Sequence, residues 1–90
     1  DFLGLVLDYD EVNKIATIEV RNYFESGQIV QFFGPNHETF EYQINTIYDD
    51  EDNIIKVCRH PKSIIKMNVD DKLQVNDMMR LKVFDKLDVL

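Results

Sequence analysis

The sequence predicts an all-β fold, a small closed barrel of six or seven strands. Three observations support this prediction. Apolar and polar residues alternate with a period of two in several short segments, turn signals separate these segments at nearly regular spacing, and no segment sustains an apolar stripe at helical spacing. A barrel is favoured over a sandwich because 90 residues leave little chain for two full sheets, and because closure removes exposed strand edges.

Three strands are predicted before the first proline. Residues 3–7 and 15–21 alternate regularly and are joined by a polar turn, so they form a hairpin. Residues 28–33 form the third strand, which stops at Gly34-Pro35 because proline has no N–H to give to a ladder.

The fourth predicted strand contains an irregularity. Its apolar residues over 40–44 share one face, but Ile47 falls out of phase with them. A bulge near Asn45 or Thr46 would restore the inward direction and bend the strand, as closure of a barrel requires.

Three further strands are predicted over 54–59, 64–69 and 78–83, so the domain spans residues 1–83 and residues 84–90 form a tail. The alternation also predicts which side chains point inward. The predicted core consists of Leu5, Leu7, Ile18, Val20, Val30, Phe32, Tyr42, Ile44, Ile65, Met67, Leu81 and Val83.

Composition limits the function. The chain has a net charge of −7, with 12 acidic and 2 basic residues in 1–52 and 5 acidic and 8 basic residues in 53–90. Long-range repulsion of phosphates therefore disfavours strong autonomous binding of nucleic acid. A single cysteine favours a reducing compartment, so we expect a cytoplasmic protein. No apolar run approaches the length of a membrane span, and the start at Asp1 suggests a domain of a longer protein.

The second half carries a possible basic face, formed by Lys56, Arg59, His60, Lys62 and Lys66. Lysine is common on strand edges, where it opposes aggregation, and this interpretation is favoured. A patch that contacts phosphates is the alternative.

Neither a metal site nor an active site is predicted, and no cofactor is expected. A calcium loop opening at Asp49 would need Gly and Glu where Ile54 and His60 stand, so a solvated turn is favoured. Cys58 and His60 do not converge as a nucleophile and its base must, and a small buried cysteine beside a turn histidine is favoured.

The aromatic residues favour core packing over a base-stacking platform, because glutamates flank them. Adjacent Phe32 and Phe33 must face opposite sides of their strand. We therefore expect Phe33, beside Pro35, to be an exposed docking surface.

Three ordered segments carry a family resemblance: Arg21-Asn22-Tyr23-Phe24 with Gly27 and Phe32-Phe33-Gly34-Pro35, then Arg59-His60-Pro61, and then Asn76-Asp77-Met78-Met79-Arg80. Together they resemble the C-terminal domain of the collagenase-like peptidase family of unassigned catalytic type (family U32). The resemblance covers residues 4–80. It implies a small barrel similar to the second-domain barrel of translation elongation factors, placed after a catalytic domain whose cysteine-containing signature is absent here.

Some motif residues have structural explanations of their own. Gly27 suits a turn position with positive φ, and Asn22 is expected to bond the backbone of the following loop. Arg59 and Arg80 are expected to pair with the acidic half of the chain. The residues assigned to structural roles are Asn22, Phe24, Gly27, Phe32, Gly34, Pro61, Asn76, Asp77, Met78 and Met79.

The resemblance leaves two functions open. The first is a non-catalytic accessory module that docks on the catalytic domain of its own chain or presents a polypeptide substrate to it. The second is an RNA-contacting module, because family members are implicated in hydroxylation of the wobble uridine of transfer RNA. Docking is slightly favoured. The candidate surface residues are Arg21, Phe33, Pro35, Lys56, Arg59, His60, Lys62 and Arg80.

Overall fold

The computed structural model describes residues 2–82 and confirms the all-β class, with ten strands and no helix in that range. Several strands have only two residues, too few for alternation to reveal them. The strands are β1 (Phe2–Asp10), β2 (Ile15–Val20), β3 (Phe24–Glu25), β4 (Ile29–Gly34), β5 (His37–Gln43), β6 (Ile47–Tyr48), β7 (Ile54–Ile55), β8 (Val57–Cys58), β9 (Ile64–Asn68) and β10 (Met78–Leu81).

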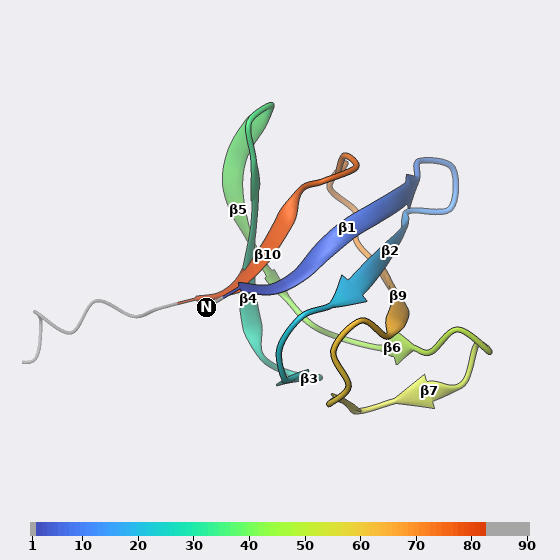
Figure 1. Cartoon of the computed structure of the whole chain (residues 1–90). Helices are drawn as coiled ribbons and strands as arrows, with labels where there is room; N and C mark the ends of the chain where they lie inside the picture. The colour runs from blue at the N-terminus through green and yellow to red at the C-terminus, as the bar shows by residue number, and fades with distance from the viewer. Residues whose placement is uncertain (1, 83–90) are drawn as a thin grey trace, which may run out of the picture.

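Eight strands form one antiparallel sheet in the order β5-β4-β10-β1-β2-β9-β6-β7, while β3 and β8 form a separate pair. Figure 1 shows β1 and β2 between β4, β5 and β10 on one side and β6, β7 and β9 on the other. The sheet has two ends, β5 and β7, which are not paired with each other. The predicted closed barrel is therefore not confirmed: the sheet bends around the core without closing.

The inward face of β1 differs from the prediction. Leu3 and Val6 are buried, whereas Leu5 is half-buried and Leu7 is exposed. The register with β10 shifts between Phe2 and Gly4, and a Cβ on Gly4 would lie 2.7 Å from Cγ2 of Ile18, so Gly4 faces inward directly after Leu3. This bulge moves the alternation by one residue, which is why the core prediction for Leu5 and Leu7 is wrong.

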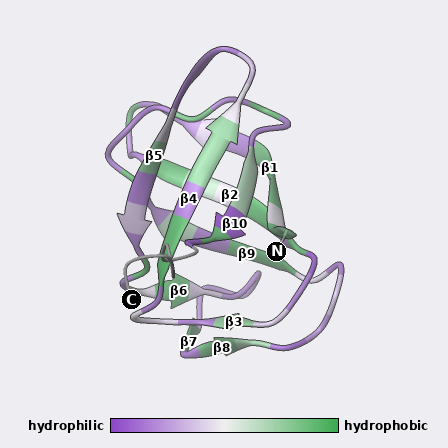
Figure 2. Ribbon diagram, turned by 90° about the vertical axis from the view of Figure 1, so that its left-hand side faces the viewer, coloured by the Kyte–Doolittle hydropathy of each residue, from purple (hydrophilic) through white to green (hydrophobic). Residues whose placement is uncertain are grey.

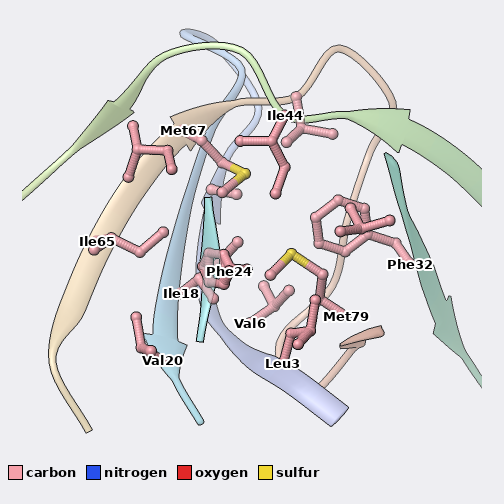
Figure 3. Packing of buried hydrophobic residues seen from close by; sticks show 14 of the residues in the cluster. Leu3, Val6, Ile18, Val20, Phe24, Phe32, Ile44, Ile65, Met67 and Met79 are labelled. Atoms are coloured by element: carbon pink, nitrogen blue, oxygen red, sulfur yellow. The ribbon is translucent and has the colours of Figure 1, made fainter. Parts of the chain in front are cut away.

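The rest of the predicted core is mostly confirmed. Two residues, Tyr42 and Leu81, are only half-buried and pack against its margin, and Val83 lies outside the described residues. In Figure 3 side chains from β2, β4, β9 and β10 point into one interior, where Met67 and Met79 fill space between them. The predicted core residues that are fully buried are Ile18, Val20, Val30, Phe32, Ile44, Ile65 and Met67.

Several core residues were not predicted because they lie in very short strands or loops. Phe24 in β3, Val69 and Leu73 are buried in this way. Ile47 is buried together with Ile44, but the register shows no bulge between them. Instead, β5 ends at Gln43 and a new strand, β6, begins at Ile47, so the out-of-phase spacing reflects an interruption of the strand.

The glycine turn that precedes β4 agrees with the prediction. Gly27 has a φ of 95°, which favours glycine. Its N–H donates to Ile44 O at 2.8 Å, while Ile44 N–H donates to Gln28 O at 2.9 Å. The turn thereby holds the start of β4 against the end of β5.

The β3–β8 pair lies with β7 at one end of the molecule, away from the turn of the β4–β5 hairpin (Figure 2). Phe24 opposes Cys58 in this pair, and both side chains are buried. Because the pair is antiparallel, the loop that leaves β8 after Cys58 starts beside Tyr23, the residue that enters β3.

Candidate functional site

A cluster of basic side chains forms where the loop after β8 meets the end of β2. Lys62 N–H donates to Val20 O at 2.6 Å, and Val20 N–H donates to Ser63 O at 2.8 Å. These bonds place residues 59–63 beside Arg21, the residue that follows β2. We call Arg21, Arg59, His60 and Lys62 the basic cluster.

The turn within this loop has a defined geometry. Ser63 Oγ donates to His60 O at 2.7 Å, and Lys62 has a φ of 72°, in the left-handed region. The turn leaves Arg59, His60 and Lys62 exposed. None of these three side chains forms a hydrogen bond or ion pair with another part of residues 2–82.

The basic loop borders a hollow of about 460 Å³. It is lined by Cys58, Ile64 and Ile65 and by two acidic residues of the β6–β7 turn, Asp49 and Asp50. The lining of the hollow thus combines apolar side chains with charges of both signs.

Tyr23 adds an aromatic ring to the same end. It precedes Phe24, which opposes Cys58, so it lies beside Arg59, and it is 49% exposed. Its hydroxyl donates to Glu25 Oε2 at 2.6 Å. That hydrogen bond raises the pKa of Tyr23, and the positive charge of Arg59 acts in the opposite direction.

Arg21 is the most constrained member of the basic cluster. Its Nε donates to Glu19 Oε1 at 2.8 Å, and its guanidinium carbon lies 5.3 Å from the centre of the Phe2 ring. Such an arrangement holds the guanidinium in a fixed direction while part of it still faces solvent.

The other predicted basic residues lie elsewhere. Lys56 is at the opposite end of β8 from Arg59, where its carbonyl accepts the Ser26 N–H at 2.9 Å. In β9, Lys66 Nζ lies 3.9 Å from Asp52 Oδ1. The loop residues 59–62 and Arg21 are therefore the part of the predicted basic set that the fold brings together.

Cys58 is buried, as predicted, and carries no reactive thiolate. Burial raises the pKa of its thiol to about 11, so the sulfur stays protonated at neutral pH. His60, two residues later, is exposed. The pair has no geometry for nucleophilic attack assisted by a base.

The acidic run is a hairpin turn between β6 and β7, as predicted. Asp49 Oδ1 accepts the N–H groups of Glu51 and Asn53, both at 2.9 Å, and the bond from Asn53 is the main cause of the lowered pKa of Asp49. Within residues 2–82 no three His, Cys, Asp or Glu side chains gather as metal ligands would.

A second polar site, which the sequence did not predict, lies at the β4–β5 turn. Asp77 is 1% exposed. Its Oδ2 lies 2.7 Å from His37 Nε2 and accepts the backbone N–H of Gln74 at 2.8 Å. His37 Nδ1 lies 2.8 Å from Glu38 O. Both ring nitrogens therefore face acceptors, and these bonds raise the pKa of His37.

Gly34 completes this site, which we call the His37–Asp77 corner. A Cβ on Gly34 would lie 2.0 Å from Asp77 Oδ1, so the carboxylate occupies the space that a side chain at position 34 would fill. Asp77 also has the only carboxyl group in the part of the chain described that is fully buried. The sequence analysis assigned structural roles to Gly34 and Asp77, but nothing in the sequence linked His37 to them.

Some predicted side-chain features differ in the structure. Phe33 faces away from the core, as predicted, but it is half-buried instead of fully exposed, because the Arg80 guanidinium carbon lies 4.5 Å from its ring centre. Arg80 does not pair with an acid within residues 2–82; its Nε donates to Gln31 Oε1 at 2.9 Å. Asn22 braces the start of β1, donating from Nδ2 to Phe2 O at 2.5 Å, instead of bonding the loop that follows it.

Two further predicted positions are exposed. Pro35 lies in the turn after β4, as expected. Arg59 was expected to pair with the acidic half of the chain, but it forms no ion pair with the described acidic residues. No helix long and apolar enough to cross a membrane occurs among residues 2–82.

These features define the class of protein: a small all-β module with a basic loop cluster at one end and a His37–Asp77 pair at the turn of its β4–β5 hairpin. The chain belongs to peptidase family U32, since residues 1–80 match the C-terminal domain of that family. The resemblance expected from the motif residues is thereby confirmed.

One curated relative is much longer than this chain. The chain is 45% identical over 80 residues to tRNA hydroxylation protein P1 of Bacillus subtilis (strain 168), which covers 89% of this chain and 19% of the relative. It thus spans about a fifth of the length of that curated relative.

Two crystal structures of the C-terminal domain of a Geobacillus thermoleovorans protein assigned to the U32 peptidases have the same fold. One superposes with a TM-score of 0.89 at 42% identity, covering 92% of this chain and 93% of that one. Its selenomethionine variant gives a TM-score of 0.86 at 44% identity, covering 89% and 98%.

Proposed function

We propose that this domain is a non-catalytic accessory module that contacts RNA through the basic cluster, in a longer protein of transfer RNA modification. The observation that carries the proposal is the exposed loop of Arg59, His60 and Lys62, whose side chains form no hydrogen bond or ion pair among residues 2–82. Side chains with unused donors beside a hollow are available to a ligand rich in acceptors.

The chemistry of the cluster suits a nucleic-acid backbone. Arginine binds phosphate through two parallel N–H donors, and lysine binds it as a point charge. An exposed aromatic ring such as Tyr23, 49% exposed beside Arg59, offers a surface on which a base can stack. The cluster therefore combines two kinds of contact that RNA accepts.

The acidic remainder of the chain limits the strength of such contacts. With a net charge of −7, and with Asp49 and Asp50 in the lining of the same hollow, the domain attracts phosphate only locally. We infer that it adds a few contacts to binding that is supplied mainly by the rest of the longer protein. The name of the Bacillus subtilis relative supports transfer RNA as the class of ligand.

The proposal gives no reaction step to this domain. Its cysteine is buried and protonated, and the carboxylates in residues 2–82 are either exposed or held by hydrogen bonds. In this proposal, the reaction of the longer protein takes place in the part that precedes the matched C-terminal domain.

Titration of full-length protein with transfer RNA at two salt concentrations tests the proposal. The double variant Arg59→Ala/Lys62→Ala is compared with Lys14→Ala/Lys72→Ala, which removes the same charge from exposed positions outside the cluster. We expect weaker binding and a salt slope reduced by about one unit per lost phosphate contact in the first variant alone. Equal affinity and slope in the two variants would contradict the proposal.

A further inference from the structure

The outward face of the β1–β10–β4 part of the sheet carries apolar side chains in register. Leu5 in β1 opposes Met78 in β10, and Met78 opposes Phe33 in β4. Adjacent strands are about 5 Å apart, so these three side chains form a continuous row across the sheet. The row exists because the bulge at Leu3 and Gly4 turns Leu5 outward.

Two further exposed apolar residues lie close to the row along the chain. Leu7, 38% exposed, lies two residues beyond Leu5, and Val75, 57% exposed, precedes Asn76, whose N–H donates to Val6 O at 2.8 Å. Met78 itself is 40% exposed. We call Leu5, Leu7, Phe33, Val75 and Met78 the outer apolar face.

This face differs from isolated exposed residues elsewhere. Val12 lies in the β1–β2 turn and Ile54 in the short strand β7, each as a single exposed side chain of the kind that is normal on protein surfaces. A contiguous set on three neighbouring strands is typical of an interaction surface. It also lies on other strands than the basic cluster.

We propose that the outer apolar face docks on the polypeptide that precedes this domain in the longer proteins of the family. The matching family unit is a C-terminal domain, and the curated relative has about four fifths of its length outside the match. Phe2 opposes Arg80 in β10, so a chain arriving at Phe2 passes the edge of this face. The preceding part is thus held beside the face by the covalent connection, which favours it over a free partner.

The chemistry of the matching surface follows from the groups at the edge of the face. It is apolar at its centre and has a carboxylate within reach of Arg80, which is exposed and fixed by the Phe33 ring and by Gln31. A guanidinium already held in place loses little conformational entropy when it binds a carboxylate.

Cysteine labelling tests the inference. Leu7→Cys places a thiol on the outer apolar face, Met78→Cys is a second probe, and Val12→Cys is the matched control on an exposed turn. Each variant is made in this domain alone and in the full-length protein, and maleimide labelling is followed by mass spectrometry of the modified peptide. The domain from Geobacillus thermoleovorans crystallised by itself, so the isolated domain is a suitable reference. Cys58 adds little background because it is buried and protonated.

We expect both face probes to be labelled at least about tenfold more slowly in the full-length protein than in the isolated domain, because docking covers them. A tenfold difference in rate corresponds to a docked form that is populated about ten to one over the undocked form. The Val12→Cys control should react equally in both. Equal rates for the face probes in both proteins would overturn the inference.

Other occupants give other patterns, and each of them overturns the inference. Protection that grows with the concentration of the isolated domain indicates a second copy, and protection lost on deletion of residues 84–90 indicates the tail. Protection that needs added transfer RNA indicates RNA. The RNA titration of the basic cluster uses different residues, so failure of one proposal does not decide the other.

Discussion

The two histidines occupy environments of opposite character. His37, in the His37–Asp77 corner, has acceptors at both ring nitrogens, and its carboxylate partner is fully buried. His60, in the basic cluster, is exposed, and its carbonyl, not its ring, takes part in the turn. The first ring is part of the structure of a hairpin turn, whereas the second is available to a ligand.

The difference shows what decides the role of a polar side chain in this fold. His37 lies at the start of β5, where its Nε2 meets Asp77 from the segment before β10 and its Nδ1 meets the carbonyl of the next residue, Glu38. His60 lies on a loop at the end of the molecule, where only one side faces protein. Convergence of strands, and not residue type, separates structural from available polar groups.

The largest expected effect tests the structural half of this comparison. Asp77→Ala leaves His37 and the Gln74 N–H without their acceptor in a buried position, so we expect a loss of about 3 kcal/mol in the free energy of unfolding. Urea denaturation measures it. Asp71→Ala, at an exposed position, is the control and should change stability by less than about 0.5 kcal/mol. Similar values for the two variants would show that the corner is not structural.

A smaller loss is expected from Gly34→Ala, because the new Cβ would lie 2.0 Å from Asp77 Oδ1 and the carboxylate must move. We expect about 2 kcal/mol, the usual cost of overpacking. Since the clash requires Asp77, the double variant Gly34→Ala/Asp77→Ala should lose less than the sum of the two single changes. Strict additivity in this double-mutant cycle would be evidence against the close contact.

The pH dependence of stability separates the two histidines. The pKa of His37 is raised above 6.5 in the folded state, so its contribution is fully present below pH 6.5 and is lost as the pH rises through the folded pKa. The stability difference between the wild type and His37→Gln should therefore shrink from pH 6 to pH 9 in urea titrations. A difference that is constant over this range would indicate that the charge of His37 has no role.

The smallest effect is expected at the other histidine. His60→Ala should change the free energy of unfolding by less than about 0.5 kcal/mol, because the ring is exposed and the turn depends on its backbone carbonyl. Thermal unfolding monitored by circular dichroism measures this. A clear loss would mean that the basic cluster also supports the fold.

The sequence predicted the strands whose alternation is regular. Ile18 and Val20 in β2, and Val30 and Phe32 in β4, are buried as expected. The prediction failed in β1, because a bulge changes the phase of a strand without changing its composition.

The candidate site shows the same limit. Arg59, His60 and Lys62 were predicted as a group because they are close in sequence, whereas Lys56 proved to lie at the other end of β8. Asp77 and His37 are 40 residues apart, and only the register of strands brings them together. Contacts that depend on register are not visible in one sequence.

The place of β10 in the sheet has a consequence for how the chain folds. The β4–β5 hairpin pairs with the rest of the sheet only through β10, which is the last strand in residues 2–82. During synthesis, the edges of β1 and β4 that β10 occupies stay open until residues 78–81 have left the ribosome. Pairing over such long sequence separations is slow, and open edges favour aggregation. The sheet is therefore completed only after the other strands in residues 2–82 have been synthesised, and a chain that stops before Met78 lacks the strand that joins the β4–β5 hairpin to β1.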